Sequence, residues 1–295
     1  MKARKAFEKT MEGLLFGAAM VSVLAVILIT VFLFQSGLPL FAKVKVTDFL
    51  FKADWAPTAA SPRFGILAFI VGSFYVTGLA LLIAVPVGLS VGIYLAELSG
   101  KRSARIIRSA VELLAGIPSV IYGLFGIAVI SAASRLLFGG TGYSVLSAAI
   151  VLAIMTLPTI INVTEVSLRA VPRELKEASL ALGSTEWQTI VKVLVPAGRS
   201  GIIAGVVLGM GRAIGETMAV LMVGGNAPVM PGGPLSMVRT LTMNIITDMS
   251  YATGDHLTSL FATGMVLFVF ILALNLGVQV FLKRSISQIE GGRGA

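Results

Sequence analysis

Long apolar segments with few or no charges alternate with short polar segments along most of the chain. Six of the apolar segments are long enough to cross ~30 Å of hydrocarbon, which takes about 20 helical residues. They cover residues 13–34, 65–96, 113–134, 143–164, 202–225 and 260–282. The pattern predicts an all-α, polytopic membrane protein with six transmembrane helices. An even number of crossings places both chain termini on the same side of the membrane.

The first apolar segment could instead belong to a cleaved signal peptide. Such a peptide has an apolar region of about 7–15 residues that is followed by small residues. Residues 13–34 are longer than this and end in Phe-Leu-Phe, followed by Gln35. These features favour a retained helix, so that residues 1–12 form a short N-terminus, residues 13–282 the six-helix domain and residues 283–295 a C-terminal tail.

Lysine and arginine are unevenly distributed between the loops of the two sides. Sixteen of them lie in the segments on the side of the termini, six lie in the loops of the other side, and Arg212 lies within a span. Cytoplasmic loops of membrane proteins carry the excess of positive charge. The distribution therefore predicts that both termini and the polar segment 165–201 are cytoplasmic.

Composition excludes several classes of protein. The chain is 56% hydrophobic and 13% charged, whereas an average soluble domain is about 25% charged. It has no cysteine and a single histidine, His256, so we expect no disulfide, no metal site and no cofactor. The net charge of +9 is compatible with nucleic-acid binding. However, the basic residues are concentrated in the loops of one side, which indicates a role in membrane topology and contact with lipid headgroups instead.

Residues 165–201, called the docking loop below, are too polar to span a bilayer but are patterned like helices. One side of a first helix carries apolar or small residues, and Gly183 is a typical helix end. A second apolar stripe follows, and we expect Pro196 to break it. The two stripes consist of Leu175, Ala178, Ser179 and Leu182, then Trp187, Ile190, Val191 and Leu194. Two short helices at one membrane face predict an element that docks on another protein; the alternative is a helix lying in the membrane interface.

The fifth span contains an arginine and a glutamate. Arg212 and Glu216 are four residues apart, hence on one face of a continuous helix, and Arg212 lies roughly 16 Å from Gly201 at about 1.5 Å per residue. Burying an arginine at that depth costs about 2.5–3.5 kcal/mol. Two interpretations remain open: Arg212 contacts an oxyanion in transit while Glu216 competes for it, or the two form a structural ion pair. Glycines 201, 205 and 209 mark a face for close helix packing.

The chain has no loop for binding nucleotide phosphates. Its one Gly-Lys pair, Gly100-Lys101, is followed by Arg102 and lacks the glycine that the Walker A pattern needs five residues earlier. The spans also hold no clustered catalytic residues. We therefore expect a protein that is not an enzyme, and any ATP-driven transport requires an ATPase from a partner subunit.

The docking loop resembles the EAA loop of ABC importer membrane subunits. Glu177-Ala178-Ser179, then Gly183 and then Pro196 match that motif in type and spacing, with serine in place of its second alanine. Residues 50–290 resemble the membrane subunits of bacterial and archaeal phosphate ABC importers, and look more like the C-type subunit (PstC) than the A-type (PstA). The supporting stretches are LLIAVPVGLSVGIYLAEL, ELLAGIPSVIYGLFG, the docking loop and GMGRAIGETMAVLMVGGN.

The resemblance implies the fold, partners and function of a type I importer permease in the cell membrane. The implied partners are a second related permease subunit, two copies of an ATP-binding subunit and an extracytoplasmic phosphate-binding protein. Glu177, Ala178, Ser179, Gly183 and Pro196 would couple to the ATPase, and Arg212 and Glu216 match positions on the phosphate path.

Three alternatives stay open: import of another oxyanion such as sulfate or molybdate, an intramembrane enzyme, and a purely structural subunit.

Five further polar residues are weaker candidates for a functional role. We expect Glu165 and Arg169 to be solvated or paired at the start of the docking loop, and His256 to have no specific role in an outer loop. Asn226 and Asn275 more often bond across helices than bind solute.

Overall fold

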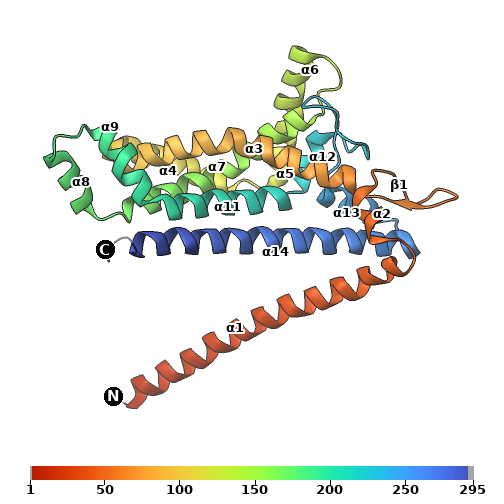
Figure 1. Ribbon diagram of the computed structural model, residues 1–295, viewed down its shortest axis with the longest axis horizontal. Coiled ribbons are helices and arrows are strands. Elements are labelled where there is room, and N and C mark those ends of the chain that lie inside the picture. The colour runs from red at the N-terminus through yellow and green to blue at the C-terminus, as the bar shows by residue number, and fades with distance from the viewer. Residues whose placement is uncertain (1, 292–295) are drawn as a thin grey trace.

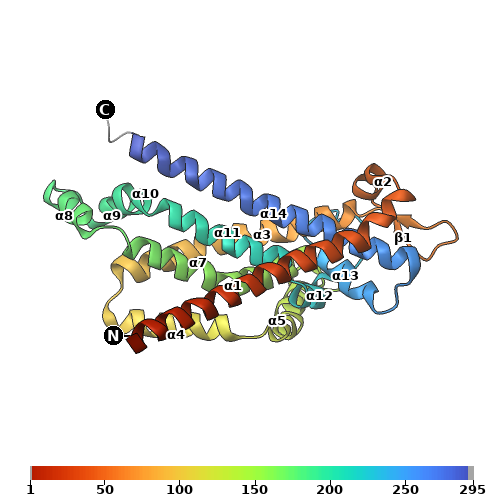
Figure 2. The same cartoon turned by 90° about the horizontal axis from the view of Figure 1, so that it is seen from below.

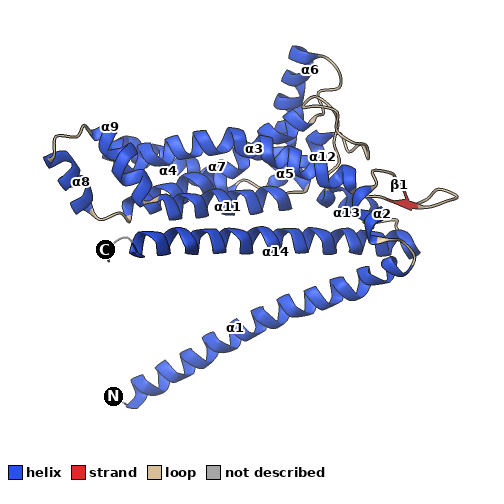
Figure 3. Cartoon of the chain, viewed as in Figure 1, coloured by secondary structure: helices blue, strands red, loops and turns tan. Residues whose placement is uncertain are grey.

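The protein is a helical bundle with one small hairpin, seen in a computed structural model that describes residues 2–291 and the side chains of residues 7–277. The longest helices share one general direction (Figure 1), and helices make up nearly all of the regular structure (Figure 3). The α-helices are α1 Lys2–Gly37, α2 Val46–Phe51, α3 Leu67–Ile93, α4 Lys101–Gly116, α5 Ser119–Phe125, α6 Ala132–Phe138, α7 Val145–Arg169, α8 Arg173–Ala181, α9 Glu186–Thr189, α10 Val195–Ala197, α11 Arg199–Gly215, α12 Met218–Gly224, α13 Leu241–Met249 and α14 Gly254–Gly291.

Shorter elements connect these helices. A 3₁₀ turn, η1 (Leu38–Ala42), follows α1, and three π-helical turns continue other helices: η2 (Tyr94–Leu98), η3 (Gly126–Ser131) and η4 (Ile190–Leu194). Strands β1 (Trp55–Ala56) and β2 (Arg63–Phe64) pair antiparallel. Two perpendicular views place α8, the start of α1 and the end of α14 toward the same end of the molecule, the terminal end (Figures 1 and 2). The β-hairpin and α2 lie at the other, the hairpin end.

Five helical segments are long and apolar enough to cross a membrane, and a sixth candidate is a bent pair. The five segments are Phe7–Ala42, Leu67–Leu98, Ser119–Phe138, Val145–Arg169 and Gly254–Gly277. The pair joins Glu186–Ala197 to Arg199–Gly215 at an angle of 71°. Each of the six predicted spans overlaps one of these, which confirms an all-α, multi-pass membrane protein.

Helix α7 is the centre of the bundle and packs against the glycine faces of two helices. Gly88 and Gly92 of α3 contact Ile160 and Thr164 of α7 so closely that a Cβ at either glycine would come within 2.7 Å of them. The predicted glycine face of α11 packs beside it, where Gly201, Gly205 and Gly209 meet Ser167, Val163 and Ile160. The expectation of close helix packing at these glycines is confirmed.

Helix α1 diverges from the bundle and is exposed along its apolar length (Figure 1). Contact with α14 is made near the hairpin end, where the rings of Phe32 and Phe261 lie 5.6 Å apart and those of Phe34 and Phe268 6.4 Å apart. This geometry leaves most of the apolar surface of α1 available to lipid or to another protein.

Two predicted spans are not continuous helices. The third breaks at Ile117-Pro118, where α4 ends and α5 begins, because a proline disfavours the helical conformation in the residue before it. The fifth, expected over residues 202–225, ends at Gly215 and resumes as α12 at Met218. The helices that follow these two breaks, α5 and α12, pack against each other through Gly123 and Met222.

Candidate functional site

The break in the fifth span separates Arg212 from Glu216. Arg212 lies in the last turn of α11, where a cation interacts favourably with the helix dipole. Glu216 lies beyond the helix end, and its Oε1 accepts a hydrogen bond from the backbone N–H of Ala219 at 3.1 Å. The prediction that both residues share one helix face is wrong, and no ion pair joins them among the described side chains.

Arg212 is exposed and has no hydrogen-bond or ion-pair partner within the described part of the chain. It lies within electrostatic reach of Tyr122 on α5, whose hydroxyl donates to the carbonyl oxygen of Leu114 at 2.7 Å. Beside Tyr122 is an apolar pocket of about 320 Å³ that α4, α5 and α7 form together. An unpaired guanidinium next to two broken helices can bind an anion without first losing an internal partner.

The docking loop folds as predicted into two short helices. Helix α8 is followed by Gly183, whose φ of +85° favours glycine, and Thr185 and Gln188 form a capping box at α9. The hydroxyls of Ser179 and Thr189 lie 2.9 Å apart in the buried contact between the helices. This hydrogen bond gives a physical reason for serine where the EAA motif has alanine.

Pro196 does not break the second helix of the docking loop. It lies in the first turn of α10, a position where its missing N–H costs nothing. The bend of 71° falls at the next helix junction, between Ala197 and Arg199. The expected break at Pro196 is therefore displaced by two residues to Gly198, which is buried against Leu168.

The docking loop presents apolar side chains to its surroundings. Leu182 is 88% exposed and Trp187 62% exposed, and Glu177, Ala178 and Gly183 are exposed beside them. The opposite side of the loop, with Ile190 and Leu194, is buried against Leu168 of α7. An exposed apolar surface on a loop that is firmly attached to the bundle is typical of a protein–protein docking site.

Ion pairs attach the docking loop and α4 to the bundle. Lys176 of α8 contacts Glu97 of η2 at 2.5 Å. Glu165 lies on α7 and accepts hydrogen bonds from the Nε atoms of Arg108 and Arg169, each at 2.9 Å. The side chain of Glu165 is only 7% exposed. Of the two expectations for this residue, pairing is therefore correct and solvation is not. Glu165 also raises the pKa of Arg108 by hydrogen bonding and charge.

A buried polar cluster at the hairpin end was missed by sequence reasoning. Asp248 of α13 accepts hydrogen bonds from four side chains, three of them within nine residues of it and one, Trp55, 193 residues away. The donors and their distances are Trp55 Nε1 at 3.1 Å, Arg239 Nη1 at 3.4 Å, the Tyr251 hydroxyl at 2.7 Å and His256 Nε2 at 3.2 Å. His256 is 7% exposed, so the expectation that it has no role is wrong. The nearest signal in the sequence was Arg239, a lone arginine before the apolar residues of α13.

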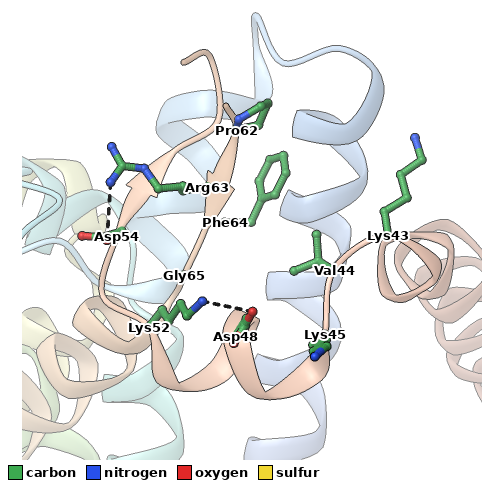
Figure 4. Close-up of a pocket in the computed structure, with 10 residues that line it drawn as sticks. All are labelled: Lys43, Val44, Lys45, Asp48, Lys52, Asp54, Pro62, Arg63, Phe64 and Gly65. Carbon is green, nitrogen blue, oxygen red and sulfur yellow. Dashed lines mark hydrogen bonds and ion pairs between the residues drawn. The ribbon is translucent and has the colours of Figure 1, made fainter. Parts of the chain in front are cut away.

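The four basic residues of loop 35–64 all line one pocket of about 460 Å³ at the hairpin end (Figure 4). Two of them are paired within it, Lys52 with Asp48 at 3.0 Å and Arg63 with Asp54 at 3.5 Å. A third, Lys43, pairs with Asp255 outside the pocket at 2.6 Å. Internal pairing leaves this pocket weakly charged, and it is a poorer anion site than the surroundings of Arg212.

Comparison with known proteins identifies the family and the fold. Residues 88–287 match the family of binding-protein-dependent transport system inner membrane components. A probable ABC transporter permease, YqgH of Bacillus subtilis (strain 168), is 41% identical over 87% of this chain and 86% of that protein. The phosphate transport system permease protein PstC of Mesorhizobium japonicum is 38% identical over 75% of this chain and 74% of that protein. PstC of Haemophilus influenzae is 32% identical over 91% of this chain and 92% of that protein.

Solved structures share the architecture at low sequence identity. A bacterial ABC transporter involved in import of the polysaccharide alginate has a chain with a TM-score of 0.64 and 15% identity, covering 95% of this chain and 99% of that one. The MetNI methionine ABC transporter gives a TM-score of 0.59 at 18% identity, covering 75% of this chain and 97% of that one. The shared fold is that of ABC importer permeases.

Proposed function

Because the chain belongs to the family of binding-protein-dependent transport system inner membrane components, we propose that it is a permease subunit of an ATP-driven importer of inorganic phosphate. The observation that carries the choice of phosphate is its similarity, over most of its length, to proteins named phosphate transport permeases. The unpaired Arg212 supports that choice, because a guanidinium matches the geometry of a tetrahedral oxyanion.

The terminal end of the bundle is cytoplasmic in this proposal. The excess of lysine and arginine in the segments of that end supports it. A phosphate-binding protein delivers the anion at the hairpin end, and a second permease subunit completes the path. The docking loop contacts an ATP-binding subunit, so that closure of two such subunits on ATP moves the bundle between outward-open and inward-open states. Arg212 contacts the anion in transit, and the chain itself carries out no covalent chemistry.

Leu182→Asp is expected to uncouple the permease from its ATPase. Leu182 is the most exposed large hydrophobic side chain of the docking loop, and a carboxylate there places an unpaired charge in an apolar interface. We expect at least a tenfold loss of ATPase subunit that copurifies with the permease, together with loss of uptake. The control is Phe51→Asp, because Phe51 is 70% exposed on α2, outside the candidate spans and at the opposite end of the bundle from the docking loop (Figure 1). Equal retention of ATPase by both variants would contradict docking through this loop.

The test of the function is uptake of radiolabelled phosphate by the assembled transporter in proteoliposomes that contain ATP. We expect uptake that unlabelled phosphate suppresses and that a hundredfold excess of sulfate or molybdate leaves nearly unchanged. Inhibition by sulfate or molybdate, with ATP-dependent accumulation of that anion, would instead identify a permease for another oxyanion. Absence of accumulation of all three anions by a complex that hydrolyses ATP would refute import of tetrahedral oxyanions.

A further inference from the structure

A basic groove opens at the terminal end between α4, η2 and the end of α7, and its volume is about 570 Å³. Four cationic side chains line it: Lys101, Arg105 and Arg108 of α4, and Arg169 of α7. Glu112 is the one carboxylate among the lining residues of this groove. The groove shares no lining residue with the apolar pocket beside Tyr122.

The charges of this groove are not balanced from within. Glu165 lies behind Arg108 and Arg169 and is shared by both guanidiniums. With Glu112 and Glu165 counted against the four cations, a net charge of about +2 remains, by the ordinary charges of these groups at pH 7. Lys101 and Arg105 have no ion pair among the described side chains, and both are exposed.

Two of the guanidiniums are held in place before any ligand arrives. Arg108 uses its Nε and one terminal nitrogen on Glu165. Arg169 uses its Nε on Glu165 and its Nη2 on the carbonyl oxygen of Leu95, the latter at 2.8 Å. Each guanidinium keeps N–H donors free, because arginine has five. Fixed donors lower the entropic cost of binding an anion.

We propose that this groove is a binding site for a phosphate group, separate from the transport path. A phosphate group carries about one to two negative charges and several acceptor oxygens, which match the excess charge and the free donors. The group can come from inorganic phosphate in the cytoplasm or from an anionic lipid headgroup. The assignment stands on the charge and geometry of the groove and goes beyond the proposed transport function.

The position of Arg169 connects this site with the docking loop. Arg169 also lines a neighbouring cavity of about 320 Å³, together with Lys176 and Glu177 of α8. An anion in the groove contacts the free donors of Arg169, while its Nε and Nη2 stay on Glu165 and the Leu95 carbonyl oxygen. The occupied site therefore contacts a side chain that borders the element proposed to receive the ATPase.

The absence of cysteine from the chain allows a direct test. Ser109→Cys places one thiol on the exposed groove wall, and Arg102→Cys places one on the same helix at an exposed position that does not line the groove. The assembled transporter is put in phosphatidylcholine nanodiscs, and labelling of this chain by N-ethylmaleimide is followed by mass spectrometry. Inorganic phosphate is titrated against chloride at constant ionic strength. We expect phosphate to slow labelling of Ser109→Cys at least threefold and saturably, and to leave Arg102→Cys unchanged.

Two further arms identify the source of the phosphate group and its location. Nanodiscs with phosphatidylglycerol, without inorganic phosphate, give the same protection if a lipid headgroup is the occupant, and added phosphate then has no further effect. Arg105→Gln combined with Ser109→Cys should abolish protection from either source. The proposal is overturned if neither phosphate nor phosphatidylglycerol protects Ser109→Cys beyond Arg102→Cys, or if protection survives Arg105→Gln. Phosphate uptake by the same preparations is scored separately, so that failure of transport is distinguishable from failure of this site.

Discussion

Arg212→Gln is expected to lower phosphate uptake by about 10- to 100-fold while the complex still assembles and hydrolyses ATP. A hydrogen bond to a charged group contributes about 1.5–3 kcal/mol, and about 1.4 kcal/mol corresponds to a factor of ten. Because Arg212 has no internal ion pair in the described structure, its replacement breaks no contact that holds the bundle together. The loss should therefore appear in transport and not in stability.

The measurement is ATP-dependent uptake of radiolabelled phosphate in proteoliposomes, with ATP hydrolysis and complex recovery recorded in parallel. Arg212→Lys keeps the charge but loses the two-pronged donor geometry, and we expect an intermediate rate. Arg135→Gln is the matched control, since Arg135 is also exposed and without an ion pair among the described side chains, but lies on α6 and not at the end of α11. Unchanged uptake by Arg212→Gln would remove the main physical support for an anion path at this residue. Loss of assembly would favour the structural interpretation of Arg212.

The sequence predicted those parts of the fold that depend on local composition. The six spans follow from apolar length, and the glycine face of α11 follows from spacing alone. The docking loop was also visible, because amphipathic spacing and Gly183 are local signals. The structure adds the partners that these elements meet, such as Ser167, Val163 and Ile160 opposite the three glycines.

The break at Glu216 could not be predicted in the same way. Residues 202–225 contain no proline and only one charged pair, which suits a continuous span. The helix ends there because Glu216 caps α12 with its own side chain and because the Thr242 hydroxyl of α13 donates to the carbonyl oxygen of Glu216 at 3.1 Å. The second contact joins residues 26 positions apart, so it is a property of the folded bundle.

The role of His256 was hidden for the same reason. A single histidine in a loop carries no spacing signal, and its partner Asp248 lies in a separate helix. The cluster exists because Trp55, Arg239, Tyr251 and His256 converge on one carboxylate in the fold. Helix α13 carries this carboxylate toward one end and Thr242 toward the other, so it connects the polar cluster at the hairpin end with the break beside Arg212.

Asp248→Ala is expected to be strongly destabilising, by about 3–5 kcal/mol, the usual cost of removing one partner from a buried ion pair. The side chain of Asp248 is 3% exposed and that of Arg239 10% exposed, so water cannot replace the lost acceptor. The variant leaves the guanidinium of Arg239 and the donors of Trp55 and Tyr251 without their carboxylate. We expect the temperature at which half of the purified complex aggregates to fall by at least about 5 °C.

Asp255→Ala is the matched control for this effect. Asp255 also forms an ion pair at the hairpin end, with Lys43. The side chains of Asp255 and Lys43 are 49% and 64% exposed, and such exposed pairs contribute about 0–1 kcal/mol. If the two variants lose equal stability, burial does not decide the strength of the Asp248 cluster. A loss of uptake by Asp248→Ala at temperatures where the complex remains intact would show, in addition, that α13 holds the break at Glu216 in its transporting geometry.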